Sequence, residues 1–106
     1  MNYIVFDLEW NQCPYGKGQE NERIPFEIIE IGAVKLNSER QIIDQYQVLI
    51  QPRVYKKLHH RTREIIQMDM KLLEREGIPF YRAVKEFLKW CGDCLLYTSD
   101  AADDRI

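Results

Sequence analysis

The sequence contains no apolar segment long enough to span a membrane, and no signal peptide precedes the first predicted strand. Cysteine is also scarce. The chain has three, Cys13, Cys91 and Cys94, and an odd, sparse set argues against a disulfide framework. We therefore expect a cytoplasmic protein without structural disulfides.

A surplus of basic charge is missing as well. The 106 residues carry a formal net charge of -2, so no global positive field attracts nucleic acid and any such site must be local. Hydrophobic residues make up 45% and charged residues 30% of the chain. This composition is typical of a globular protein, and the length suits one small domain at most.

The sequence Cys91-Gly92-Asp93-Cys94 matches the spacing of a redox or zinc motif. A redox motif of this kind lies at a helix N-terminus, where the helix dipole lowers the thiol pKa, whereas this one falls at a predicted helix C-terminus. A zinc site needs two further ligands at suitable spacing, and none is apparent. We therefore assign the pair no function.

The most informative motif is Asp7-Leu8-Glu9, which follows the apolar run Tyr3-Ile4-Val5-Phe6. A strand this apolar is typical of the middle of a sheet. Residues i and i+2 point to the same face, so Asp7 and Glu9 are predicted to lie side by side. Their mutual repulsion favours a divalent metal between them. The alternative is a surface pair with one solvated and one salt-bridged carboxylate.

Hydrophobic periodicity predicts three strands followed by helices. A polar loop with Pro14, Gly16 and Gly18 is expected between the first strand and the second. The two later strands, joined by a short turn, are expected to form an antiparallel hairpin to which the first strand is added. The predicted elements are strands 2–10, 26–36 and 41–50, and helices 58–67, 70–76 (with Asp69 as N-cap and Gly77 as the stop) and 79–91.

The last predicted helix carries a regular apolar stripe. Its members recur at i, i+3, i+4, i+7, i+8 and i+11, which is the spacing of one buried face. We expect this face to pack across the sheet. The residues of the stripe are Phe80, Ala83, Val84, Phe87, Leu88 and Cys91.

The sequence changes character after Asp93. The stretch 94–104 resembles the translation of a transposon-end sequencing adapter, and appended segments are excluded from fold reasoning. We therefore predict a natural part, 1–93, and a non-native tail, 94–106; a natural acidic tail is the alternative. Because the tail offers no β-rich segment, one edge of the first strand is expected to stay unpaired.

Two blocks, Tyr3–Trp10 and Phe26–Leu36, together resemble the start of a DnaQ-like 3′–5′ exonuclease of the DEDDh branch, near the KapD-like and histone-mRNA exonucleases. The similarity covers nearly all of residues 2–93. It implies the N-terminal part of an α/β, RNase H-like fold. Three antiparallel strands and a packing helix are expected, without the remainder of the mixed sheet.

The resemblance also implies chemistry. The family uses two divalent ions, Mg²⁺ or Mn²⁺, held by four acids beside a general-base histidine, to hydrolyse the 3′ ends of RNA or DNA. Asp7 and Glu9 match the first acidic motif and are the predicted catalytic, metal-binding residues. The other acids and the histidine have no counterpart: Asp93 precedes the expected fourth strand, and His59 and His60 precede the packing helix. This chain is therefore expected to be an inactive fragment.

Leu8, Trp10 and Glu30 are candidates for binding the terminal nucleotide. Leu8 and Trp10 could offer backbone N–H groups or packing to the sugar and base. A Trp at a strand end is, however, more often part of the core. Glu30 lies among isoleucines, where a carboxylate needs a partner, so a neighbouring residue that satisfies it is the competing interpretation.

One basic cluster follows the third strand and is the only local concentration of positive charge. Contact with phosphate is plausible for such residues, but we favour a solvated helix face. The cluster consists of Arg53, Lys56, Lys57, Arg61 and Arg63, with His59 and His60.

Two other classes of protein remain open. The chain could be a non-catalytic nucleic-acid-binding or regulatory module built on half of an RNase H-like fold. It could also be an autonomous α+β protein whose D-x-E motif is structural. No membrane partner is expected in any of these cases.

Overall fold

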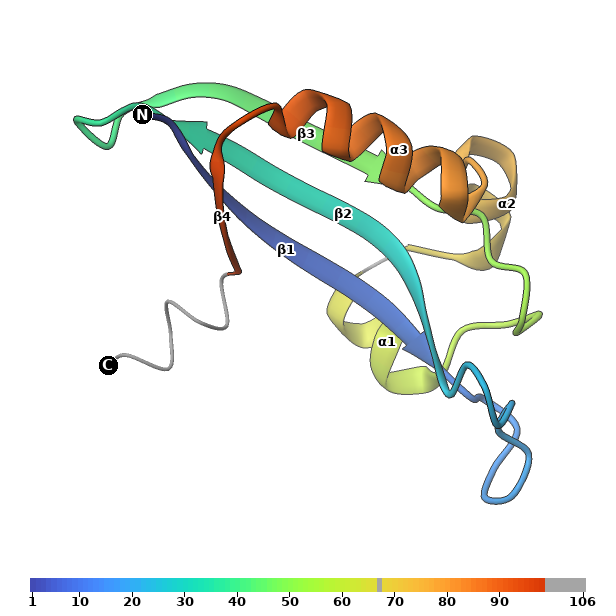
Figure 1. Ribbon diagram of the computed structural model, residues 1–106. Coiled ribbons are helices and arrows are strands. Elements are labelled where there is room, and N and C mark those ends of the chain that lie inside the picture. The colour runs from blue at the N-terminus through green and yellow to red at the C-terminus, as the bar shows by residue number, and fades with distance from the viewer. Residues whose placement is uncertain (67, 99–106) are drawn as a thin grey trace, which may run out of the picture.

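A computed structural model describes residues 1–66 and 68–98 (Figure 1). The predicted hairpin and all three predicted helices are present; the first helix starts two residues and the third one residue later than predicted. The second helix has the predicted bounds. The elements are β1 (Tyr3–Gln12), β2 (Phe26–Leu36), β3 (Ile42–Leu49), α1 (His60–Ile66), α2 (Met70–Glu76), α3 (Phe80–Cys91) and β4 (Leu95–Thr98).

The strands form one mixed sheet in the order β3-β2-β1-β4. β1 pairs antiparallel with β2, and β2 with β3, as predicted. β4 runs parallel to β1, from Tyr3 opposite Leu95 to Phe6 opposite Thr98. No described helix is long and apolar enough to cross a membrane.

The expectation that one edge of β1 stays unpaired is therefore wrong for Tyr3–Phe6, which pair with β4. Sheet pairing uses backbone groups, and the short sequence Leu95-Leu96-Tyr97-Thr98 has the apolar and β-branched side chains that a strand accepts. Gly92 has a φ of 59°, a value that favours glycine, and lets the chain turn from α3 into β4. The boundary at residue 93 stays a prediction.

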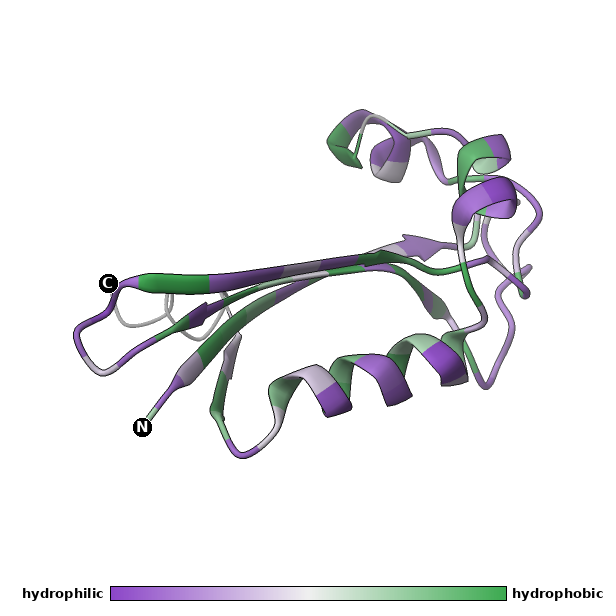
Figure 2. Ribbon diagram, turned by 90° about the horizontal axis from the view of Figure 1, so that it is seen from above, coloured by the Kyte–Doolittle hydropathy of each residue, from purple (hydrophilic) through white to green (hydrophobic). Residues whose placement is uncertain are grey.

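The helices lie on both faces of the sheet (Figure 2). α3 covers one face, and its core joins Ile4 and Ile31 of the sheet to Ala83, Phe87 and Cys91 of the helix. We call this side the α3 face. α1 and α2 lie over the other side.

The apolar stripe of α3 is narrower than predicted. Its buried residues, Ala83, Phe87 and Cys91, are four apart, whereas Phe80 is 48% and Leu88 is 56% exposed. Successive helical residues are turned by about 100°, so Leu88 lies on the flank of the row that faces the sheet. The prediction was wrong for these two positions because a single sheet contacts only one row closely.

A second core joins α1, α2 and the sheet around Ile29, Leu58 and Leu73. Helix α2 is capped as predicted: Asp69 Oδ1 accepts a hydrogen bond from the backbone N–H of Leu72 at 2.8 Å. At Gly77 an added Cβ would lie 2.6 Å from the backbone nitrogen of Gln51. Only glycine fits there, so the end of α2 is held close to the end of β3.

The two neighbouring residues of α3 provide a matched test of this packing. We expect Phe87→Ala to lower the free energy of unfolding by about 3–5 kcal/mol, because it opens a cavity in the α3 core. Leu88→Ala should change it by no more than about 0.5 kcal/mol, as an exposed substitution does. Urea denaturation of both variants measures the difference, and equal effects would contradict the packing described.

The parallel strand β4 has its own consequence. A chain that ends at Cys94 would leave the backbone groups of Tyr3–Phe6 without their β4 partners, and such an edge pairs readily with other molecules. We expect this shortened chain to self-associate more than the 106-residue chain. Size-exclusion chromatography with light scattering measures it, and an equally monomeric shortened chain would refute the role assigned to β4.

Candidate active site

Asp7 and Glu9 lie on the face of β1 that points away from α3. Leu8, between them, packs into the α3 core, so the predicted alternation places both acids on the opposite side. Asp7 is paired across the sheet with Gly32, and Glu9 with Glu30. We call this side of the sheet the acid face.

A β-bulge brings the third carboxylate, Glu30, onto the acid face. The register of β1 and β2 shifts between Glu9 and Trp10, with Trp10 opposite Ile28. Ile28 packs against the α3 core, so uninterrupted alternation would turn Glu30 to the α3 face as well. The additional residue, Ile29, reverses this. Glu30 consequently lies beside Glu9.

The three carboxylates affect one another. The pKa of Glu9 is raised above its ordinary value, chiefly because the group is partly desolvated, and further by the negative charges of Asp7 and Glu30. A hydrogen bond between the Glu9 and Asp7 carboxyl groups raises it too. The acid face therefore disfavours the ionised form of Glu9.

Glu30 also has a neutral partner. Its Oε2 accepts a hydrogen bond from the side-chain amide of Gln47 on β3. The competing interpretation of Glu30 was a carboxylate satisfied by a neighbouring residue. It is correct for Oε2, which accepts the hydrogen bond from Gln47. A shallow hollow of about 360 Å³ lies here, lined by Glu30, Gly32 and Gln47 among others. A Cβ added at Gly32 would meet no atom within 4 Å.

Carboxylate oxygens are the donors that hard divalent cations prefer. Asp7 and Glu9 therefore fit a metal as far as their donor atoms go. Within the described residues, however, no three His, Cys, Asp or Glu side chains are grouped so that they could hold an ion. The pair is at most part of a metal site.

The other predicted site residues are placed differently. Trp10 follows the bulge, is 53% exposed, and has its ring centroid 5.9 Å from that of Phe26. The expectation that this Trp belongs to the core is therefore wrong. Leu8 has its side chain in the α3 core, so only its backbone is left to meet a ligand on the acid face.

Sequence reasoning missed two polar anchors beside the site, the buried Asn11 and the half-buried Glu27. The Asn11 amide donates to the carbonyl oxygen of Lys57 at 3.0 Å and accepts from the backbone N–H of His59 at 2.8 Å. The Glu27 carboxylate accepts from the backbone N–H groups of Arg53, at 2.6 Å, and Val54, at 2.9 Å. The sequence signal that could have identified them is a polar residue at the end of an otherwise apolar strand, such as Asn11, or at its beginning, such as Glu27.

These anchors fix the backbone of the basic cluster, while most of its side chains are exposed. His59 and His60 stack with ring centroids 4.3 Å apart. The pKa of His59 is lowered, chiefly because the imidazole is partly desolvated and further because His60 and Arg61 carry like charge nearby. A solvated surface, as favoured from the sequence, describes the cluster well. At the other end of α3, Cys91 and Cys94 are free thiols.

Comparison of the sequence with known protein families and with curated proteins finds no match. The fold, in contrast, matches solved nucleases. A full-length 3′-exonuclease superposes with a TM-score of 0.66 at 22% identity, over 85% of this chain and 38% of its own. The nuclease domain of 3′hExo, a DEDDh family member bound to rAMP, superposes with a TM-score of 0.64 at 17% identity. The match covers 90% of this chain and 50% of that structure.

Cell-death related nuclease 4 gives a TM-score of 0.65 at 14% identity, over 84% of this chain and 29% of its own. The chain thus spans half or less of each of these three structures. The described part of the chain, a mixed four-stranded sheet with three helices, has the fold of part of these RNase H-like exonucleases. The predicted fold class is confirmed, although the sequence predicted only three of the four strands.

The charge on Glu9 gives a test by pH. Because its pKa is raised in the folded protein, ionisation destabilises the fold, and this cost appears as the pH rises through that pKa. We expect Glu9→Gln to have a higher Tm than the parent at about pH 7, and the difference to vanish below about pH 4, where unfolded Glu is also protonated. Thermal denaturation at both pH values measures it.

Mg²⁺ supplies the second half of this test. At about pH 7 we expect Mg²⁺ to raise the Tm of the parent chain and to leave that of Glu9→Gln unchanged. Glu39→Gln, in the exposed turn after β2, is the control for a lost surface charge. An equal Mg²⁺ response in the parent and in Glu9→Gln would refute the metal role of the pair.

Proposed function

We propose that this chain is part of a metal-dependent 3′–5′ exonuclease that hydrolyses phosphodiester bonds at the ends of RNA or DNA. The observation that carries the proposal is the position of Asp7-Leu8-Glu9. The motif lies on a central strand of an exonuclease-type fold, with both carboxylates on the face opposite α3. Its partner would be a single-stranded or 3′-ended nucleic acid.

In this proposal Asp7 and Glu9 are the catalytic, metal-binding residues. Two bound divalent ions, Mg²⁺ or Mn²⁺, would supply an activated water and stabilise the leaving 3′ oxygen. Glu30 adds negative charge next to Glu9, which strengthens the attraction for cations. The backbone at Leu8 would meet the terminal nucleotide. The ring of Trp10, opposite Ile28 on the α3 face, would contact it only around the end of β1.

A second candidate is favoured by one observation. Asp7 and Glu9 lack the further ligands, among the described residues, that a two-ion site needs. The chain could thus act as a non-catalytic nucleic-acid-binding or regulatory module with the same half-fold. For the 106-residue chain alone both proposals expect negligible turnover, so they separate only when more of the gene is read.

The experiment uses the uninterrupted reading frame of the gene. If it continues past residue 93 into a strand, an Asp-bearing helix and a His…Asp motif, its protein should release mononucleotides from single strands in Mg²⁺ while the 106-residue chain does not. Asp7→Asn should lower this rate by more than about 100-fold, since outer-shell changes at metal sites alone cost 10–100-fold.

Glu39→Gln is the matched control and should keep the parent rate. Hydrolysis that survives Asp7→Asn unchanged would refute the catalytic role of the motif. A longer protein that binds the strand without cleaving it would favour the non-catalytic module.

A further inference from the structure

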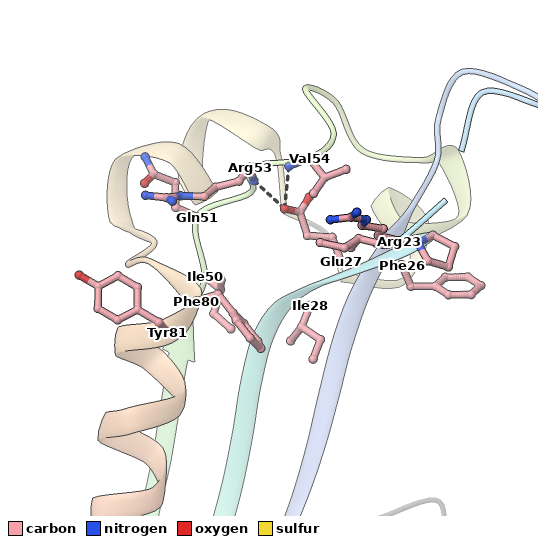
Figure 3. Close-up of a pocket in the computed structure, with 12 residues that line it drawn as sticks. Arg23, Phe26, Glu27, Ile28, Ile50, Gln51, Arg53, Val54, Phe80 and Tyr81 are labelled. Carbon is pink, nitrogen blue, oxygen red and sulfur yellow. Dashed lines mark hydrogen bonds between the residues drawn. The ribbon is translucent and has the colours of Figure 1, made fainter. Parts of the chain in front are cut away.

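A hollow of about 570 Å³ lies on the α3 face of the sheet, where β2 begins, β3 ends and α3 begins (Figure 3). Its volume is that of a small-molecule site. Ile28 and Ile50 contribute an apolar floor. Because Ile28 lies on the α3 face, the hollow is separate from the carboxylates of the acid face.

Aromatic rings surround this floor. Phe26 is 55% exposed, Phe80 48% and Tyr81 71%, and all three line the hollow. Figure 3 shows Phe26 at one end and Tyr81 at the other, with Phe80 between them. Exposed aromatic faces around a concavity are suited to stacking with flat ligands.

Positive charge stands at both ends. Arg23, before β2, lies on the side of Phe26, and Arg53, after β3, lies on the side of Tyr81 (Figure 3). Neither forms a salt bridge with a described residue. The nearby Glu27 directs its oxygens at backbone N–H groups of the loop that follows β3, so it fixes the site without pairing with either guanidinium.

The first turn of α3 adds to this charge. Its N-cap, Pro79, provides no side-chain hydrogen bond, so the N–H groups of the first turn, beside Phe80 and Tyr81, have no side-chain cap. A helix N-terminus carries partial positive charge. The hollow therefore combines stacking surfaces with donors for anions.

We propose that this hollow binds unpaired nucleotides of a single-stranded nucleic acid, with bases on the aromatic rings and phosphates on Arg23 and Arg53. The inference deepens the proposed exonuclease function and rests on it. Alternating rings and cations are the pattern that single-strand binding sites use. A duplex, whose bases are already stacked, cannot use these rings.

The ring centroid of Trp10 lies 5.9 Å from that of Phe26, so Trp10 extends the aromatic surface of the hollow. A strand that occupies the whole hollow contacts both arginines, which a short oligonucleotide cannot do equally well.

Fluorescence anisotropy of the 106-residue chain tests this, with 5′-fluorescein oligouridines of four and sixteen nucleotides in EDTA. We expect the 16-mer to bind more tightly than the 4-mer and a 16-base-pair duplex to bind weakly. Phe80→Ala should weaken 16-mer binding about tenfold. Arg53→Gln should reduce the slope of log affinity against log salt by about 0.7, the value for one phosphate contact on a single strand.

Two control variants match these changes. Leu88→Ala removes an equally exposed apolar side chain from the same helix, and Arg40→Gln removes a cation from the turn at the other end of β2; both should keep the parent affinity. Phe26→Ala removes an aromatic ring that β2, not α3, contributes to the hollow. If one of the two aromatic variants does not fold, the other still tests the proposal. Circular dichroism checks the fold of each variant.

Unchanged 16-mer affinity in Phe80→Ala, Phe26→Ala and Arg53→Gln would overturn the inference. A second outcome would also overturn it: an acidic, phenylalanine-containing peptide binds the parent chain, the variants lose affinity for this peptide, and their affinity for the 16-mer stays unchanged. The proposed function fails separately: Asp7→Asn should leave 16-mer binding intact. If the longer protein never hydrolyses RNA or DNA while the hollow binds RNA, only the exonuclease proposal is lost.

Discussion

The antiparallel pairing of β1 with β2 is the constraint on which the rest of the molecule depends. It gives Leu8 to the α3 core and both carboxylates of the D-x-E motif to the opposite face. The bulge after Glu9 then turns Glu30 to the same side. Without that single additional residue in β2, the acid face would hold two carboxylates and the α3 core would have to accommodate a third.

The two faces of the sheet consequently differ in the residues that they carry. One face is covered by α3 and supports stability through ordinary apolar packing. The other gathers the carboxylates of Asp7, Glu9 and Glu30, and their proximity together with partial desolvation raises the pKa of Glu9. Ionisation of Glu9 is thus less favourable in the folded chain than in water.

Much of this was predictable from the sequence, because it depends on local patterns. Strand alternation placed Asp7 and Glu9 together, and the capping signals of α2 gave both its ends. Non-local facts were missed. The bulge, the pairing of Leu95–Thr98 with β1 and the exposure of Trp10 depend on which segments meet in space, and one-dimensional periodicity carries no such information.

The Asn11 and Glu27 anchors have a consequence for evolution. They hold the loop after β3 through its backbone N–H and carbonyl groups, so the shape of that loop does not depend on side chains such as Arg53 and Lys56. Substitutions there can alter surface charge while the scaffold keeps its form. The surface charge of this loop can therefore change during evolution without a change of the fold.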